Sequence, residues 1–205
     1  MRYRNIPSET IRRLPIYLRA LHILKRQNKT TISSSGLSEI VAVNSWQVRK
    51  DFSYFGAFGK RGSGYDIDEL AKQISKILKL HTRHRVALVG VGNLGSAVLA
   101  YPGFEPYGFD IVTAYESDSK KIGKKIHGVI VEDISNLKDL RKDKIDLALI
   151  AVPESAAQQI AEQLVKAGVK GILNFSPRHI QVPKRIKVFT IDIAMDLARL
   201  PFYIA

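Results

Sequence analysis

The sequence predicts an α/β protein of two domains, with a mainly helical N-terminal domain and a C-terminal domain built on a parallel sheet. Three observations predict this arrangement. The chain has 205 residues, which is enough for two small domains. Residues 86–191 alternate short apolar runs with helical patterns, as in sheets whose strands are joined by helices. A Gly-x-Gly-x-x-Gly motif at 90–95 begins only after a long basic segment.

The positive charge is concentrated before the glycine motif. Residues 1–80 contain 15 Lys and Arg against 6 Asp and Glu, whereas residues 81–205 contain 17 against 13. A basic domain of this kind predicts a polyanionic partner, nucleic acid before membrane, and the alternative is a solvated basic surface.

Composition excludes several kinds of site. The chain has no cysteine, so disulfides, thiolate metal sites and thiol catalysis are excluded, and no metal site is predicted. No apolar run reaches roughly 18 residues, and the first residues lack the apolar stretch of a signal peptide. We therefore expect a soluble, cytoplasmic protein that does not bind membranes.

The first eighty residues predict a helix-turn-helix. A helix should begin near Ser8, and Pro15 should kink it or begin a second helix. A serine cap should then open a short helix near 34–41, and Asn44 or Ser45 should cap another over 46–55. Two short helices joined by a tight turn, with polar and basic residues early in the second, are typical of DNA-binding modules.

A glycine-rich segment at 56–65 predicts a β-hairpin wing after the second of these helices. Lys60 and Arg61 would lie at its tip, where they could enter a minor groove or contact phosphate. A flexible linker is the alternative. Arg or Lys suits guanine O6 and N7, and Gln suits adenine. The residues predicted to bind double-stranded DNA are Arg12, Arg13, Ser45, Gln47, Arg49, Lys50, Ser53, Lys60 and Arg61.

A polar joint at 81–84 separates the two domains. Before it, Asp66 and Glu69 resemble a capping box that opens an amphipathic helix. The predicted boundaries are 1–80 for the winged-helix domain, 81–192 for the sheet domain and 193–205 for a final apolar helix. An unpaired apolar helix at a chain end favours a homodimer.

The glycine motif predicts a dinucleotide site. An apolar strand at 86–89 runs into it and an Ala/Leu-rich helix follows, which would lay a pyrophosphate on the helix N-terminus. Gly90 would form the tight turn, Gly92 would let the backbone approach the pyrophosphate, and Gly95 would let helix and strand pack closely. The sheet domain is therefore predicted to be of the Rossmann type.

Glu116 lies 21 residues after Gly95, at the end of the predicted second strand. A carboxylate there would accept hydrogen bonds from the ribose hydroxyls and repel a 2′-phosphate, so NAD⁺ and NADH are favoured over NADP(H). Lys120 and Lys121 weaken that preference without reversing it. The predicted cofactor-binding residues are Gly90, Val91, Gly92, Asn93, Leu94, Gly95, Glu116, Ala151, Val152, Pro153, Asn174 and Phe175.

No catalytic residue is predicted. None of the five histidines lies in a recognisable pattern with a carboxylate, and only 30 residues follow Phe175, too few for a substrate domain. The bound dinucleotide would then itself be the signal, and the protein would not be an enzyme.

Several segments match a known family pattern in their order and spacing, namely Ile6–Arg19, Gln47–Gly56, Phe58–Tyr65, Gly90–Gly95 and Gly171–Phe175. On these segments the chain resembles the Rex family of redox-sensing transcriptional repressors over nearly its whole length. The resemblance implies a homodimer with an N-terminal winged helix and a C-terminal Rossmann domain. It also implies binding to palindromic operator DNA with NAD⁺ or without NADH, and release when NADH binds.

The resemblance further implies that the final helix, expected over 194–204, is exchanged between subunits. It implies a switch network of Arg19, Tyr101 and Asp192 across domain and subunit boundaries. Two alternatives remain at this point. One is an NAD-dependent dehydrogenase with a basic N-terminal appendage, and the other is a nucleoid or RNA-binding protein that uses its sheet domain only to dimerise.

Overall fold

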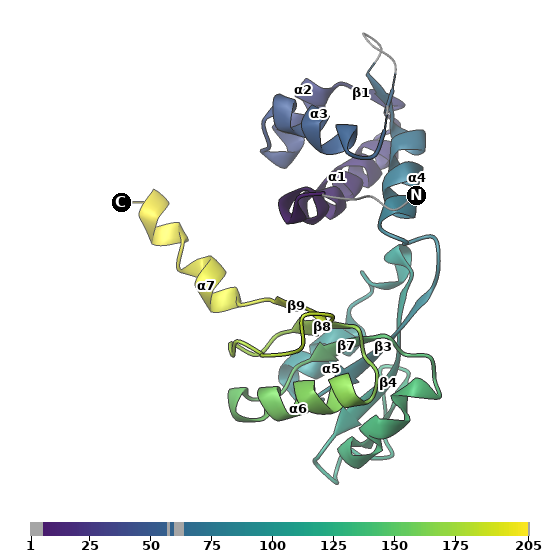
Figure 1. The fold of residues 1–205 in the computed structure, drawn as a ribbon, viewed down its shortest axis with the longest axis vertical. Coiled ribbons are helices and arrows are strands. Elements are labelled where there is room, and N and C mark those ends of the chain that lie inside the picture. The colour runs from purple at the N-terminus through teal and green to yellow at the C-terminus, as the bar shows by residue number, and fades with distance from the viewer. Residues whose placement is uncertain (1–5, 57, 60–63, 205) are drawn as a thin grey trace. The chain divides into compact units, whose positions relative to one another are not determined.

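The computed structural model describes residues 6–56, 58–59 and 64–204. The chain divides into two compact units between Thr82 and Arg83, within the polar joint expected at 81–84 (Figure 1). We call them the N-terminal unit and the C-terminal unit.

The N-terminal unit contains four helices and two short strands among the described residues. They are α1 (Ser8–Arg26), β1 (Thr31–Ile32), α2 (Ser34–Val41), α3 (Ser45–Ser53), β2 (Tyr65–Asp66) and α4 (Ile67–Ile77). Helix α1 continues through Pro15, so the prediction of a second helix beginning there is not the one adopted. Its buried residues, such as Leu14, Leu18 and Leu21, recur at helical spacing and form the centre of this unit.

Both helices of the expected helix-turn-helix begin at side-chain caps. The Ser33 hydroxyl accepts a hydrogen bond from the Gly36 amide at 3.0 Å, and the Asn44 side-chain oxygen accepts one from the Trp46 amide at 2.8 Å. Ala42, with φ of 52°, ends α2 in the left-handed region, which turns the chain sharply toward α3. Val48 and Phe52 of α3 face inward and are buried.

A two-stranded antiparallel ladder lies next to the segment predicted to form the wing. Thr31 of β1 pairs with Asp66 of β2, and Ile32 pairs with Tyr65. Asp66 also caps α4, because its carboxylate accepts a hydrogen bond from the Glu69 amide at 2.8 Å. Lys60 and Arg61, expected at the wing tip, lie outside the described residues.

The C-terminal unit is built on a seven-stranded sheet in the order β5-β6-β4-β3-β7-β8-β9 (Figure 1). All neighbouring pairs are parallel except β5 and β6. The strands are β3 (His84–Val89), β4 (Phe109–Glu116), β5 (Lys125–Ile126), β6 (Val129–Asp133), β7 (Leu147–Ile150), β8 (Gly171–Asn174) and β9 (Lys187–Thr190). The helical elements are α5 (Asn93–Ala100), η1 (Glu105–Tyr107), η2 (Ile134–Arg141), α6 (Glu154–Lys166), α7 (Ile193–Leu197) and η3 (Leu200–Tyr203).

Alternate residues of β3 point into two different cores. Ala87 and Val89 join the core beneath α6 and η2, whereas Val86 and Leu88 join the core that contains Val98 of α5. This alternation follows from the two-residue period of a strand. It makes β3 a central strand that is buried on both faces, and the glycine motif begins where β3 ends.

The expected continuous helix over 194–204 is wrong. Helix α7 ends at Leu197 and a separate 3-10 turn, η3, runs from Leu200 to Tyr203. Pro201 explains the interruption, because proline has no amide hydrogen to donate to the carbonyl four residues before it, that of Leu197, where α7 ends. Phe202 and Ile204 are 80% and 83% exposed, so this C-terminal segment packs little against its own chain.

Within the part of the chain that the structure describes, no helix has both the length and the apolar character needed to cross a membrane.

Candidate DNA-binding and dinucleotide-binding sites

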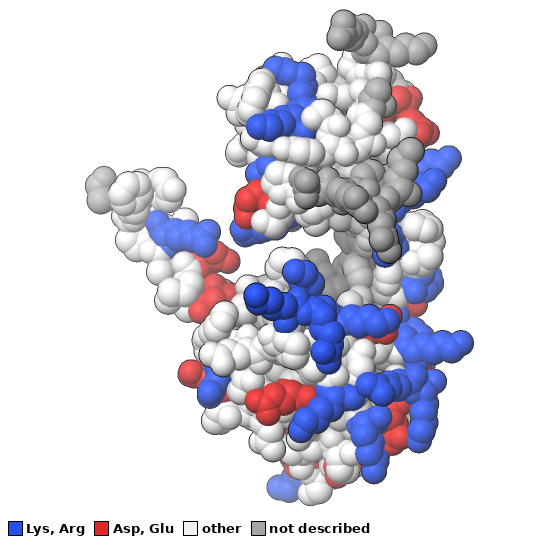
Figure 2. Space-filling model, viewed as in Figure 1, with Lys and Arg blue, Asp and Glu red and all other residues white. Residues whose placement is uncertain are grey.

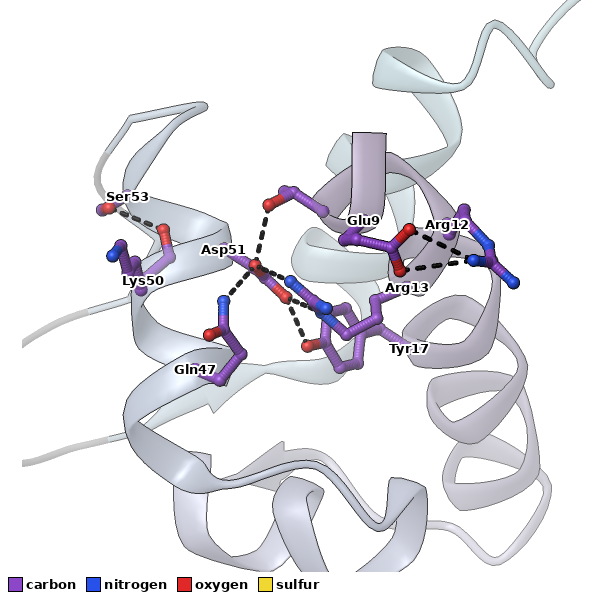
Figure 3. A network of polar contacts seen from close by, with 9 residues as sticks. Glu9, Arg12, Arg13, Tyr17, Gln47, Lys50, Asp51 and Ser53 are labelled. Carbon is purple, nitrogen blue, oxygen red and sulfur yellow. Dashed lines mark hydrogen bonds and ion pairs between the residues drawn. The ribbon is translucent and has the colours of Figure 1, made fainter. Parts of the chain in front are cut away.

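A buried carboxylate fastens α3 to α1 (Figure 3). Asp51 on α3 is wholly buried. Its Oδ1 accepts hydrogen bonds from Thr10 Oγ1 at 2.9 Å, Arg13 Nη2 at 2.7 Å and Gln47 Nε2 at 2.8 Å, and its Oδ2 accepts from Arg13 Nε at 2.5 Å and Tyr17 Oη at 2.7 Å. A buried charge is tolerated only when it is paired and hydrogen-bonded, and Asp51 meets both conditions.

The network keeps Asp51 ionised. Burial acts to raise its pKa, but the hydrogen bonds from Arg13, Tyr17 and the other partners outweigh burial and lower the pKa below its ordinary value. The hydrogen bond between Arg13 and Asp51 raises the pKa of Arg13, and burial raises the pKa of Tyr17. The Arg13–Asp51 pair is therefore a permanent ion pair at neutral pH.

Four of the residues predicted to contact DNA form hydrogen bonds or ion pairs with other side chains of the N-terminal unit. Arg13 and Gln47 are bonded to Asp51 and so orient α3. Arg12 forms an ion pair with Glu9 at 3.1 Å. The pair is exposed, so replacing Glu9 by a DNA phosphate as the partner of Arg12 costs little free energy. Arg49 Nη1 donates to Ser34 Oγ at 2.9 Å and links α3 to the start of α2.

The outer side of α3 presents Trp46 and Lys50. Trp46 is 57% exposed, and the Lys50 ammonium lies 4.7 Å from the centre of its ring. Ser53 donates its hydroxyl to the Lys50 carbonyl at 2.7 Å, and Ser45 is half-buried at the first turn. Figure 2 shows that basic side chains also gather on the visible face of the C-terminal unit, so charge alone does not single out the DNA-binding surface.

The three glycines of the motif differ in their steric surroundings. Gly90 has φ of 93°, and a Cβ there would stand 2.5 Å from the Ala151 carbonyl oxygen. A Cβ on Gly95 would stand 1.9 Å from the Gly90 carbonyl oxygen, so helix and turn pack too closely for a side chain. Around Gly92 no atom lies within 4 Å of the same position, which leaves the backbone open to a ligand.

The peptide groups at Val91 are held from the β4 side. Glu116 Oε2 accepts a hydrogen bond from the Val91 amide at 2.8 Å, and Lys121 Nζ donates to the Val91 carbonyl at 3.0 Å. Burial acts to raise the pKa of Glu116, but the amide hydrogen bonds from Val91, Ser117 and Asp118 lower it below its ordinary value. Glu116 is therefore ionised at the edge of the glycine turn.

One pocket of about 310 Å³ joins the glycine turn to the carboxyl ends of β4 and β7. The predicted cofactor residues that line it are Gly90, Gly92, Glu116, Ala151, Val152 and Pro153. An open backbone at Gly92, the start of α5 and an ionised carboxylate together fit the pyrophosphate and ribose of a dinucleotide.

Other predicted cofactor residues serve the fold as well. The Val91 side chain is buried in the core on the α5 side, so only its backbone faces the turn. Asn93 is the first residue of α5, and Leu94 follows it and is 40% exposed. Asn174 is wholly buried, and its amide donates to the carbonyls of Ser176 and Arg178 at 2.9 and 3.0 Å. Phe175 packs against the same core as Val91, and neither it nor Asn174 lines the pocket.

The three expected switch residues fall on different elements. Arg19 is exposed on α1. Tyr101 follows α5, is 59% exposed and makes an edge contact with Phe104. Asp192 caps α7, since its carboxylate accepts a hydrogen bond from the Met195 amide at 3.1 Å. Their meeting in one network stays a prediction.

Two residues were missed by reasoning from the sequence. The sequence indicates that Asp51 is buried, because Asp51 has the same inward spacing as Val48 and Phe52. A buried acid needs a cation as its partner. Lys121 was weighed only for its charge, and nothing local in the sequence indicates that its ammonium reaches the glycine turn.

Two family models match this chain, one in the N-terminal unit and one over most of the C-terminal unit. Residues 81–178 match the family described as "CoA binding domain", and residues 5–53 match "Putative DNA-binding protein N-terminus". The chain is 46% identical over 200 residues to a redox-sensing transcriptional repressor Rex from Carboxydothermus hydrogenoformans, covering 97% of this chain and 96% of the relative. It is 42% identical to a Rex from Streptomyces coelicolor, covering 98% and 79%.

Solved structures give the same result for the whole fold. The structure of RSP in complex with β-NAD⁺ and operator DNA matches with a TM-score of 0.91 and 34% identity, covering 98% of this chain and 93% of RSP. The structure of RSP in complex with β-NADH matches with a TM-score of 0.89 and 33% identity, covering 97% and 94%. RSP is described as a Rex-family repressor. On these likenesses, the chain belongs to the Rex family of redox-sensing transcriptional repressors.

Proposed function

We propose that this chain is a transcriptional repressor that senses the balance of NADH and NAD⁺. It binds palindromic operator DNA through α3 with NAD⁺ or without NADH, and it releases the DNA when NADH binds. The observation that carries this proposal is the full-length likeness to RSP, which has been solved both with operator DNA and β-NAD⁺ and with β-NADH. The dehydrogenase alternative is wrong, because the relatives are repressors and not enzymes.

The division of labour follows the two units. The N-terminal unit presents Lys50 on the exposed side of a recognition helix, where an ammonium can reach guanine O6 and N7. The C-terminal unit supplies the pocket around Gly92 and Glu116 for the dinucleotide. The predicted wing residues Lys60 and Arg61 would add contacts to phosphate or the minor groove. We expect the protein to act in the cytoplasm, where operator DNA and both forms of the cofactor are found.

The active species is a homodimer in which residues 193–205 are exchanged. Two apolar surfaces of the C-terminal unit support this. The segment from Ile193 onward exposes large apolar side chains such as Leu197 and Phe202. One sheet face carries an apolar hollow of about 360 Å³, lined in part by Phe109 and Phe189. A second copy of the chain, related by a two-fold axis, supplies a matching apolar surface. A two-fold contact closes at the dimer and does not continue into a filament.

The switch lies in two states of the dimer. In the DNA-competent state the two recognition helices lie about 34–36 Å apart, which matches successive major grooves. NADH favours a closed state, with Asp192 pairing with either Arg19 or Tyr101 according to the nicotinamide redox state. To move the population from 1:99 to 99:1 the nucleotides must prefer one state by roughly 10⁴-fold, about 5.5 kcal/mol over both sites.

A gel-shift titration tests the proposal. The probe is a palindromic duplex selected by the wild-type protein from a random pool, and NADH and NAD⁺ are added in parallel series. We expect NADH to dissociate the complex at concentrations where NAD⁺ leaves it intact. Lys50→Ala should greatly weaken binding to the duplex while NADH affinity, read from nucleotide fluorescence, stays unchanged. Binding that is indifferent to NADH would contradict the proposal.

A further inference from the structure

Trp46 is a large aromatic residue on the outer side of the recognition helix. It is the only tryptophan in the chain. It is 57% exposed, although tryptophan is highly buried on average. Val48 and Phe52 of the same helix are buried, so Trp46 points away from the core on the side that a major groove would face.

Lys50 lies one helical turn after Trp46. Residues four apart share a helix face, and here the Lys50 ammonium lies 4.7 Å from the centre of the Trp46 ring. A cation within about 6 Å of an indole face is attracted by the ring quadrupole, and tryptophan is the best aromatic partner. The Trp46 backbone is held at the start of α3, because its amide donates a hydrogen bond to the Asn44 side-chain oxygen at 2.8 Å.

A lysine side chain has a long flexible stem, so by itself it can reach several neighbouring base edges or phosphates. An ammonium held over a ring samples fewer positions. Two other polar groups of α3 that were expected to read bases are hydrogen-bonded within the unit, Gln47 to the buried Asp51 and Arg49 to Ser34 at the surface. Lys50 is a basic group on the exposed side of α3 whose placement bears directly on what that side reads.

We propose that Trp46 is a specificity-determining residue that holds the Lys50 ammonium in place, so that Lys50 reads one base pair in each half-site. The inference rests on the proposed function and deepens it. An exposed cation–π contact corresponds to about 2- to 5-fold in affinity, hence about 5- to 30-fold for the two recognition helices of a dimer.

The test compares binding profiles rather than affinity alone. Wild type, Trp46→Phe, Trp46→Leu and Lys50→Met are each used to select duplexes from the same random pool, and the selected sequences are read position by position. We expect Lys50→Met to lose base preference at one position in each half-site. Trp46→Leu should lose preference at that same position, and Trp46→Phe, which keeps a weaker aromatic face, should lose less.

Three controls separate this role from a general loss of structure. Ile40→Ala removes another exposed apolar side chain, from α2, and should leave the profile intact. Neither Trp46 variant changes charge, so the slope of log affinity against log salt should equal that of wild type. NADH should still dissociate the Trp46→Leu complex, and its circular dichroism should match wild type.

The outcomes are distinct. A Trp46→Leu profile equal to wild type overturns the inference, and so does an even loss of preference at all positions. Lost preference at a position other than that of Lys50 also overturns it, because Trp46 would then contact a base by itself. In all three cases the proposed function stands, provided that the wild-type complex is released by NADH. A wild-type protein that selects no palindrome, or keeps it in NADH, removes the proposed function instead.

Discussion

Asp51 in the N-terminal unit and Glu116 in the C-terminal unit are both carboxylates whose pKa lies below its ordinary value, and they are stabilised in different ways. Asp51 is wholly buried and accepts five hydrogen bonds from side chains of α1 and α3. Glu116 accepts hydrogen bonds from backbone amides at the edge of an open pocket. The first carboxylate has no capacity left for a ligand and serves the fold. The second shapes a loop and still faces the pocket.

The largest effect is expected from Asp51→Asn. Breaking a buried ion pair leaves Arg13 without its charged partner, which costs about 3 kcal/mol in the free energy of unfolding of the N-terminal unit. Urea unfolding followed by Trp46 fluorescence measures this unit alone, because the chain has one tryptophan. The matched control is Asp68→Asn, which removes an exposed pair with Lys25 and should cost under about 1 kcal/mol. Equal losses of stability in the two variants would mean that the buried Asp51 ion pair stabilises the unit no more than an exposed pair does.

Gly92→Ala should affect ligand binding without affecting the fold. No atom lies within 4 Å of the added methyl group, so the C-terminal unit should keep its stability. The methyl would crowd the pyrophosphate and weaken NADH binding by about 1–3 kcal/mol, as overpacking does elsewhere. Calorimetric titration with NADH measures the loss. The contrasting variant is Gly95→Ala, whose methyl meets the Gly90 carbonyl and should destabilise the unit itself. Normal NADH affinity in Gly92→Ala would remove the pyrophosphate assignment.

Glu116→Gln tests the role of the second carboxylate in nucleotide binding. It removes the charge from the side chain that accepts a hydrogen bond from the Val91 amide and would accept hydrogen bonds from the ribose hydroxyls. NADH affinity should therefore fall by about 1–2 kcal/mol. The loss for NADPH should be smaller, because the repulsion of a 2′-phosphate disappears as well. Parallel titrations with the two nucleotides give the ratio, and an unchanged ratio would contradict a role for Glu116 in choosing between them.

The smallest effect is in the pH dependence of stability. A depressed folded pKa contributes stability that is complete above the unfolded pKa, about 4 for an aspartate, and is lost as pH falls through the folded pKa. Burial lowers the pKa of His22, which affects wild type and Asp51→Asn alike. The stability difference between these two proteins should therefore stay constant from pH 7 to 5 and shrink only below about pH 4. A difference that changes near pH 6 would mean that Asp51 is not the titrating group.

Much of the fold could be predicted from local signals. Helices α2, α3 and α4 begin at predicted caps, which are a serine (Ser33), Asn44, one of two candidates for its helix, and Asp66. Such caps are predictable because a capping hydrogen bond spans only two or three residues. The alternation of apolar strands with helices predicted the parallel sheet. The glycine spacing predicted the turn because Gly90 takes a positive φ of 93° and a Cβ on Gly95 would meet the Gly90 carbonyl oxygen, and both constraints arise within the motif itself.

Contacts between residues far apart in sequence account for part of what could not be predicted. Asp51 lies 38 residues after Arg13, so the sequence did not indicate that the two form a buried ion pair. Some local contacts were missed as well, since the Asn174 amide donates to the carbonyls of Ser176 and Arg178. The roles of Arg13 and Gln47 toward DNA, and of Asn174 toward the cofactor, stay predictions. The error over the final helix has another cause, because Pro201 is visible in the sequence and its missing amide donor ends an α-helix by a local effect.

The position of β3 has a consequence for motion on slow timescales. Its backbone is paired with β4 on one side and β7 on the other, and its alternate side chains enter two separate cores. Such a strand opens only when the whole unit does, so its amide protons should be among the slowest in the chain to exchange with deuterium. The turn at Gly90 continues directly from that strand, so its shape persists through every fluctuation short of global unfolding of the unit.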